Sequence, residues 1–241
     1  MILSYEQIEE IADAAIADFR EFLFEGKYDP DKPMPMYIDQ FASDYLKLDV
    51  KIERLCTDGS ICGLTAYTDT TLIVEMNGVN VPLPIKQNQV LLDVSLIQPG
   101  MVQKLCGKRR FTLAHECAHQ LLYEMDSDDT KAACRRMYTD KRGYTARELK
   151  TNEDWNEWQA NALGACLLLP RHDFALVTEY YTRGNKLVSW NGCFGRMEMQ
   201  IIRNISEFFH ASPSAVKIRL RRLGYIEERC SEDQQREVYA N

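Results

Sequence analysis

The N-terminal stretch carries its hydrophobic residues at the spacing of a helix. Neighbouring members of this set are three or four positions apart, and acidic residues lie between them. The set consists of Ile8, Ile11, Ala15, Phe19 and Phe22. This spacing places apolar side chains on one face of an amphipathic helix, so we predict a helix over residues 4–24. After the proline-containing segment 29–35, a shorter helix is predicted over residues 37–46.

The next part of the chain has the pattern of β-strands. Asn77-Gly78 separates two apolar runs and is a strong hairpin signal, because both residues tolerate the positive φ of a tight turn. The remaining apolar runs are short and end at polar or glycine residues. The predicted strands are residues 50–55, 66–76, 79–85 and 89–97.

Helical patterns return in the second half. We predict helices from Lys108 onward, over 155–169 up to Pro170, over 172–181, and a helix–turn–helix over 201–226. The order predicts an α+β fold: a small β-sheet packed on a helical half, with a helix-turn-helix-like pair at the C-terminus. The expected division is a metallopeptidase domain over 1–200, interrupted by a polar insertion or lid at 126–154, and a C-terminal segment over 201–241 packed on the same domain.

Composition narrows the class of protein. The chain has 241 residues, 45% of them hydrophobic, and a net charge of −7. These values predict a globular protein and disfavour general binding to nucleic acid or membrane surfaces. The N-terminus lacks a basic region followed by a continuous apolar run, and the eight cysteines are scattered without a C-x-x-C pair. We therefore expect a cytoplasmic protein with reduced thiols and no membrane association.

The string His115-Glu116-Cys117-Ala118-His119 is an H-E-x-x-H motif. Residues four apart lie on one face of a helix, separated by about 6 Å of rise. Two imidazoles so placed can bind one Zn²⁺, while the glutamate lies beside the open position of the metal as a general base. Apolar neighbours make this a core-facing helix, which argues against the alternative of an exposed histidine pair.

A catalytic zinc site needs a third protein ligand. The remaining histidines, His172 and His210, and the acidic residues of the helix over 155–169 are the candidates. Glu157 is the one acid inside the apolar part of that helix, although a solvated glutamate favoured by the helix dipole has the same pattern. Asn161, one turn later, can hold a metal-binding side chain by hydrogen bonding.

Two blocks of the sequence resemble a known family. R-F-T-L-A-H-E-C-A-H-Q-L-L (110–122) and E-W-Q-A-N-A-L-G-A-C-L-L-L-P (157–170) are similar to the two signature blocks of the ImmA/IrrE metallo-endopeptidases. The resemblance implies that Glu157 is the third zinc ligand. Ala118 replaces a glycine of the family pattern, and the spacer between the blocks is longer than the family pattern. We expect the longer spacer to alter the substrate cleft.

The resemblance implies peptide-bond hydrolysis at a zinc held by His115, His119 and Glu157, with Glu116 transferring the proton. A second group that stabilises the oxyanion is usual in such reactions. By residue type alone the candidates are Tyr123, Tyr138, Tyr144 and His172. Among them we would test His172 first, although an exposed turn histidine would show the same sequence.

The C-terminal helix pair is basic. Ser212-Pro213 begins its second helix, and the basic residues of that helix are Lys217, Arg219, Arg221 and Arg222. This pattern is typical of a DNA-reading helix-turn-helix. It is equally typical of helices packed on a catalytic core with solvated arginines outside, and it resembles the tail of many ImmA/IrrE proteins.

The sequence thus supports two functions from different classes. The first is a zinc endopeptidase that, by resemblance, cleaves a helix-turn-helix repressor or antitoxin-like partner and so derepresses genes of a mobile element or stress response. The alternative is a DNA-binding transcriptional regulator with a structural or vestigial metal site. A protein that binds a partner on this scaffold without cutting it is disfavoured by the presence of Glu116.

Overall fold

The computed structural model describes residues 2–56, 61–76, 78–126 and 154–230. Its contacts divide the chain into two compact units. The first unit contains residues 1–28 and 36–168, and the second contains residues 29–35 and 169–241. Each unit has its own hydrophobic core, and the two are described in turn.

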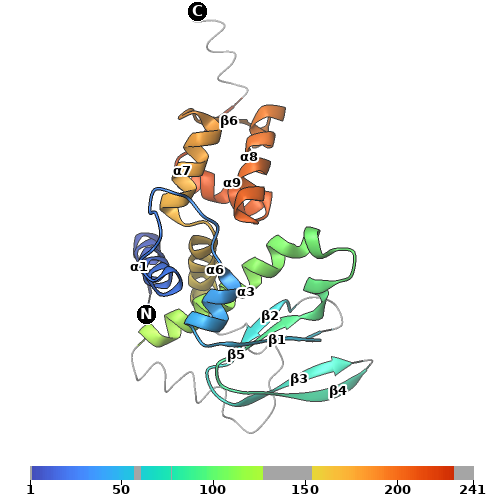
Figure 1. The fold of residues 1–241 in the computed structure, drawn as a ribbon. Coiled ribbons are helices and arrows are strands. Elements are labelled where there is room, and N and C mark those ends of the chain that lie inside the picture. The colour runs from blue at the N-terminus through green and yellow to red at the C-terminus, as the bar shows by residue number, and fades with distance from the viewer. Residues whose placement is uncertain (1, 57–60, 77, 127–153, 231–241) are drawn as a thin grey trace, which may run out of the picture. The chain divides into compact units, whose positions relative to one another are not determined.

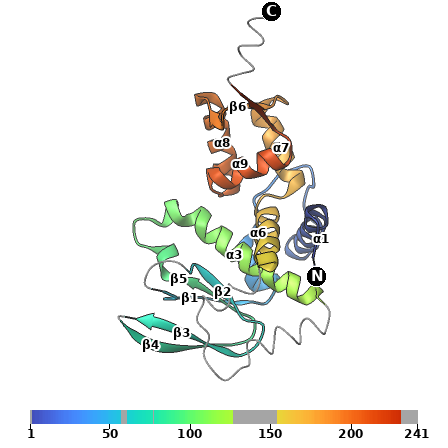
Figure 2. The same cartoon turned by 180° about the vertical axis from the view of Figure 1, so that it is seen from behind.

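The helices of the first unit surround one long central helix. The N-terminal helix begins with a capping box in which the Ser4 side chain accepts from the backbone N–H of Gln7, and the Gln7 side chain accepts from the backbone N–H of Ser4. Figures 1 and 2 show the central helix between a small sheet and a second long helix, in agreement with their contacts. The helices are α1 (Tyr5–Phe24), α2 (Ile38–Gln40), the π-helical turn η1 (Phe41–Tyr45), the central α3 (Val102–Met125) and α6 (Asp154–Leu168).

The strands of the first unit form two small sheets. One has the order β1 (Asp49–Glu53), β5 (Gln89–Asp93), β2 (Gly63–Thr65), with β1 parallel and β2 antiparallel to β5. The other is the predicted hairpin of β3 (Thr70–Met76) and β4 (Val79–Ile85). A 3-10 turn, η2 (Val94–Ile97), follows β5. Strand β5 lies at the centre of its sheet, and every one of its residues is buried.

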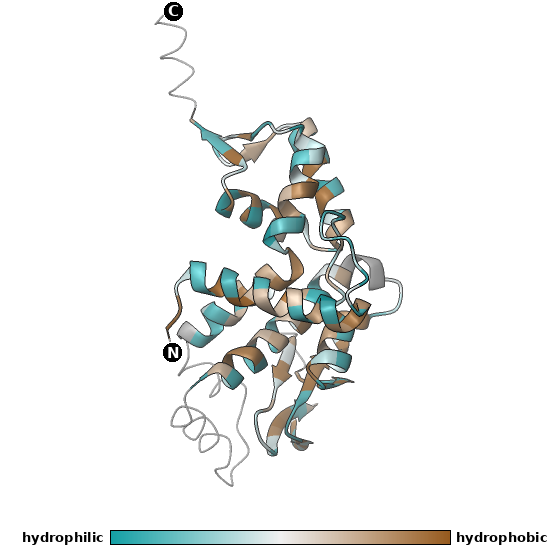
Figure 3. Cartoon of the chain, turned by 60° about the vertical axis from the view of Figure 1, so that its left-hand side comes forward, coloured by the Kyte–Doolittle hydropathy of each residue, from teal (hydrophilic) through white to brown (hydrophobic). Residues whose placement is uncertain are grey.

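The described residues of the second unit form three helices and a small sheet. Phe174, Ile202, Phe209 and Leu220 are fully buried in its core. The alternation of hydrophobic and hydrophilic residues along the helices, visible in Figure 3, matches this burial. Its elements are α7 (Arg171–Thr182), β6 (Leu187–Trp190), β7 (Cys193–Phe194), α8 (Arg196–Phe209), α9 (Pro213–Arg222) and β8 (Ile226–Arg229), with the strand order β7-β6-β8.

The fold confirms the predicted α+β class but corrects its details. The described residues form three small sheets where one was predicted: the β3–β4 hairpin is a sheet of its own, and the short strands β6 to β8 form a third. The predicted helix–turn–helix is present as α8 and α9, yet its end is β8, which pairs with β6. The compact units divide after residue 168, and α7 packs on α8 in the second unit. The assignment of residues 1–200 to one peptidase domain stays a prediction.

The predicted insertion at 126–154 lies almost wholly outside the described residues. Within the described part of the chain, no helix has both the length and the hydrophobicity needed to cross a bilayer.

Candidate metal centre

Helix α3 presents two neighbouring polar stripes to different partners. Thr112, Glu116 and Gln120 follow one another at intervals of four and therefore share a face, which lies against β2. His115 and His119 share the next face, which lies toward α6. All other sides of the H-E-x-x-H turn are apolar and buried, so the motif is inside the unit as the sequence predicted.

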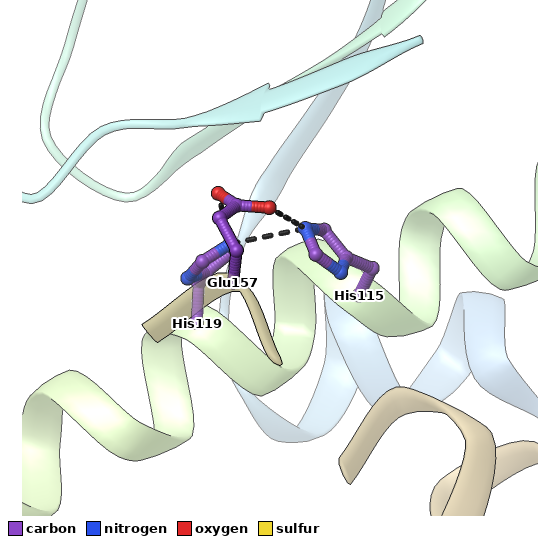
Figure 4. A group of neighbouring side chains, drawn as sticks. All are labelled: His115, His119 and Glu157. Carbon is purple, nitrogen blue, oxygen red and sulfur yellow. Dashed lines mark hydrogen bonds and ion pairs between the residues drawn. The ribbon is translucent and has the colours of Figure 1, made fainter. Parts of the chain in front are cut away.

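The two histidines and Glu157 converge on one point (Figure 4). Nε2 of His115 lies 3.0 Å from Nε2 of His119. The Glu157 carboxylate places Oε2 at 3.4 Å from His115 Nε2 and Oε1 at 3.4 Å from His119 Nε2. Ligands at the usual zinc bond lengths of about 2.0–2.2 Å in a tetrahedral site lie roughly 3.3–3.5 Å apart. Both carboxylate–imidazole distances match this spacing, the two imidazole nitrogens are slightly closer together, and the three donor types fit zinc.

The cluster is partly open to solvent. The histidine side chains are 14% and 10% exposed, whereas that of Glu157 is 42% exposed. The imidazoles are thus held by the protein interior, and the carboxylate closes the cluster from its outer side.

Electrostatic coupling links the three side chains. Hydrogen bonds to His115 and His119 hold the pKa of Glu157 far below its usual range, although partial burial opposes this. Burial disfavours the charged form of His115, but the hydrogen bond to Glu157 and the charges of Glu116 and Glu157 outweigh it and raise the pKa of His115. The carboxylates of Glu116 and Glu157 thus favour a positive charge at the position of the two imidazoles.

Glu116 lies beside the cluster but on the other stripe of α3. Its residue is 5% exposed, and burial raises the pKa of its carboxyl, an effect that the nearby charges of His119 and His115 partly offset. Raising the pKa of a carboxylate makes it a stronger proton acceptor, which suits a group that takes up a proton and returns it. Glu116 therefore has the environment of a general base rather than of a metal ligand.

Close packing of α6 on α3 brings Glu157 to the histidines. At Gly164 an added Cβ would lie 3.0 Å from the backbone nitrogen of His115 and 3.1 Å from the carbonyl carbon of Ala114. Only glycine allows the two backbones to approach this closely. The close approach of α6 to α3 therefore depends on glycine at position 164.

Strand β2 is fastened along the first stripe of α3. The Gln120 side chain donates to Oγ1 of Thr65 at 2.5 Å and to the carbonyl of Ala66 at 3.3 Å. One turn further along α3, the ring of Tyr123 stacks on Tyr67 with a centroid distance of 4.2 Å. Sequence reasoning missed β2 and Gln120. The C-G-L-T string is too short for a strand signal, and only its pairing with β5 defines it.

The supporting residues predicted from sequence are placed as follows. Asn161 lies on α6, donates from Nδ2 to the Glu157 carbonyl at 2.7 Å, and contributes through a hydrogen bond to the raised pKa of His115. His172 lies in the other compact unit, where a ring nitrogen is 3.2 Å from the Pro30 carbonyl. Tyr123 is buried against Tyr67. Tyr138 and Tyr144 lie outside the described residues, so the oxyanion group stays a prediction.

The basic helix α9 uses its arginines within its own unit. Arg219 was expected on a solvated face, but it is 2% exposed and donates from Nε to the Leu169 carbonyl at 3.0 Å. Arg221 forms an ion pair with Glu228 at 2.7 Å. Lys217 and Arg221 also lie over the ring of Phe194. Of the residues predicted to contact DNA, Arg219 is therefore buried, and the charge of Arg221 is partly neutralised by Glu228.

Comparison with models of protein families gives a match. Residues 107–221 match the family model described as the IrrE N-terminal-like domain, Peptidase_M78. The matched range includes the H-E-x-x-H helix, α6 and the α8–α9 pair. No curated protein matches the chain significantly.

Proposed function

Because the chain belongs to the ImmA/IrrE family of metallopeptidases, we propose that it is a zinc-dependent endopeptidase. One observation carries this proposal: His115, His119 and Glu157 converge at tetrahedral spacing while Glu116 is buried beside them. A purely structural zinc site is usually closed by four protein ligands. Within the described residues the cluster has three members, which is the number found in catalytic sites.

When bound there, zinc supplies a Lewis acid that polarises a peptide carbonyl and lowers the pKa of water toward neutrality. The chain contributes the proton transfer. Glu116 accepts a proton on its carboxylate as water attacks the carbonyl carbon, and it then delivers that proton to the leaving amine. Its buried position favours this exchange, because burial disfavours the charged form and raises the pKa of the Glu116 carboxyl.

Strand β2 offers a place for an extended peptide beside this carboxylate. It pairs with β5 on one side, and on its other side no strand is paired among the described residues. An open strand edge binds extended chains through backbone hydrogen bonds. This arrangement supports a protein segment, rather than a small molecule, as the substrate.

The substrate that we propose is a helix-turn-helix repressor or antitoxin-like protein, and its cleavage would derepress genes of a mobile element or a stress response. This part of the proposal rests on the family resemblance. The experiment compares cells that express the wild-type chain with cells that express Glu116→Gln, by mass spectrometry of newly formed protein N-termini. New termini in a DNA-binding protein that depend on Glu116 support the proposal, and identical termini in both strains contradict it.

The alternative of a DNA-binding regulator has weaker support than the sequence suggested. Arg219 is buried and donates to the Leu169 carbonyl, and Arg221 is paired with Glu228, so both are engaged within their own unit. DNA binding predicts an affinity that falls steeply with salt and depends on Lys217 and Arg222. Titration of a labelled duplex at two salt concentrations tests this alternative directly.

A further inference from the structure

Strand β2 begins with a glycine that its backbone conformation does not require. Several glycines of the chain, such as Gly78 and Gly100, have the positive φ that favours glycine, but Gly63 does not. Gly63 is paired with Leu92 in a regular antiparallel ladder. Glycine weakens a strand relative to other residues, and in a strand it often marks a close approach by another group. The reason for this glycine is therefore the space around it.

That space is filled by the stripe of α3 that carries Glu116. A Cβ added at Gly63 would lie 2.5 Å from Cγ2 of Thr112 and 2.8 Å from Oε1 of Glu116. Both distances are shorter than van der Waals contact between such atoms, which is about 3.5 Å or more. A side chain at this position and the observed Glu116 carboxylate cannot both be present.

The strand cannot move away to relieve such a contact. Beyond its pairing with β5, the Cys62 carbonyl accepts from the backbone N–H of Asp93 at 2.8 Å. At the other end of β2, Gln120 holds Thr65 at 2.5 Å. Both ends of β2 are thus fastened, and any added volume at Gly63 is taken up by the side chains of α3.

Of the two side chains, Glu116 is the one that gives way. Thr112 is β-branched, buried and held by the bond from its Oγ1 to the Lys108 carbonyl at 3.0 Å. The Glu116 carboxylate is the end of a longer side chain with more rotatable bonds. We propose that Gly63 is a positioning residue for the catalytic base: its missing side chain is the space in which the Glu116 carboxylate is held beside the metal-binding histidines.

This inference rests on the proposed function, since it assigns a role to Gly63 through Glu116. Gly63→Ala is expected to lower kcat by at least about tenfold, because a misplacement of a reacting group by about 1 Å costs on the order of 100-fold. Zinc content is expected to remain that of the wild type, because the atoms nearest to a Cβ at Gly63 belong to Thr112 and Glu116 and not to the three ligands. KM is expected to change little, because the strand edge itself is kept.

The test uses the full chain loaded with Co²⁺ in place of zinc, and its readout is the visible absorption spectrum, which responds to groups next to the metal. Five proteins are compared: wild type, Glu116→Gln, Gly63→Ala, Thr112→Ser and the double variant Gly63→Ala/Thr112→Ser. Thr112→Ser keeps the hydroxyl that bonds Lys108 and removes only the Cγ2 methyl group. The double variant therefore lacks the tighter contact and retains only the one with Glu116.

The proposal predicts that Gly63→Ala shifts the Co²⁺ spectrum in the direction of Glu116→Gln. It also predicts that the double variant regains thermal stability without regaining the wild-type spectrum or kcat. A wild-type spectrum and kcat in Gly63→Ala, or their recovery in the double variant, would overturn it, since Gly63 would then act only through packing on Thr112. If Glu116→Gln itself has the spectrum and activity of the wild type, the proposed function fails first and this inference fails with it.

Discussion

The helices α3 and α9 carry the most conspicuous polar residues of the chain and use them in opposite ways. On α3 the imidazoles of His115 and His119 meet a carboxylate from a second helix and leave a geometry that a metal completes. On α9, Arg219 donates a hydrogen bond to a backbone carbonyl, and Arg221 forms an ion pair with a neighbouring glutamate. Polar residues in a motif therefore indicate a functional site only where the fold brings their metal-binding or hydrogen-bonding atoms together at one point.

The largest effect is expected on the α3 side of this comparison. Glu116→Gln keeps the size of the side chain but removes the base, so we expect peptide hydrolysis to fall by about 10²–10⁴-fold with zinc content unchanged. Glu124→Gln, on the exposed side of the same helix, is the matched control and should retain activity. Hydrolysis is measured on the substrate found by N-terminal mass spectrometry. Undiminished hydrolysis by Glu116→Gln would show that Glu116 on α3 is not the catalytic base.

The next largest effect is expected on the α9 side and concerns stability. Arg219→Met removes the buried donor to the Leu169 carbonyl, so the free energy of unfolding should fall by about 1–3 kcal/mol. Arg203→Met changes an exposed arginine of α8 in the same unit and should cost less than about 0.5 kcal/mol. Thermal denaturation of the full chain checks both. Equal stabilities would mean that Arg219 is not structural and would restore it to the candidate DNA contacts.

A smaller effect is expected where α6 meets α3. Gly164→Ala places a methyl group against the backbone of His115, so α6 has to move by a few tenths of an ångström and carry Glu157 with it. We expect zinc affinity to fall several-fold, up to about the tenfold that a supporting residue contributes. Competition with a chromogenic chelator measures the affinity. An unchanged affinity would show that Glu157 does not depend on this helix contact.

The smallest effect concerns Asp93, which fastens the strand side of the site. Burial disfavours its charged form, but hydrogen bonds from Ser95 and from the backbone N–H of Leu55 outweigh this and lower its pKa. A lowered pKa contributes stability above about pH 4, where the unfolded carboxylate is also ionised, and that stability is lost as the pH falls through the folded-state pKa. Asp93→Asn should therefore be less stable at pH 7 and less sensitive to acid below pH 4, as denaturant titrations at both pH values would show. Equal acid sensitivity in both proteins would contradict this.

Much of the fold was readable from local patterns. The helix at Tyr5–Phe24, the hairpin of β3 and β4, and the helices α6 and α7 lie within a few residues of their predicted positions, because each has a strong periodicity and clear end signals. Strands β2 and β6 to β8 were missed, since two to four residues carry no period and are defined by partners far along the chain.

The site also contains residues that a local sequence pattern predicts and residues that only distant contacts define. The spacing of His115 and His119 follows from helix geometry, whereas Glu157 was one of several candidates until the family resemblance selected it. Gly63 gave no sequence signal, because its role depends on a contact with α3 that no local pattern contains. Arg219 was misread because a basic residue on a short helix looks the same in sequence whether it faces solvent or a backbone carbonyl.

The central claim is the three-ligand zinc site, and elemental analysis of the purified chain tests it most directly. Wild type and Glu157→Ala are measured in parallel, with Glu53→Ala, an exposed glutamate of β1, as the control. The account predicts about one zinc per chain in the wild type and in Glu53→Ala, and little or none in Glu157→Ala. No stoichiometric zinc in the wild type after zinc is added, or full zinc in Glu157→Ala, would contradict it.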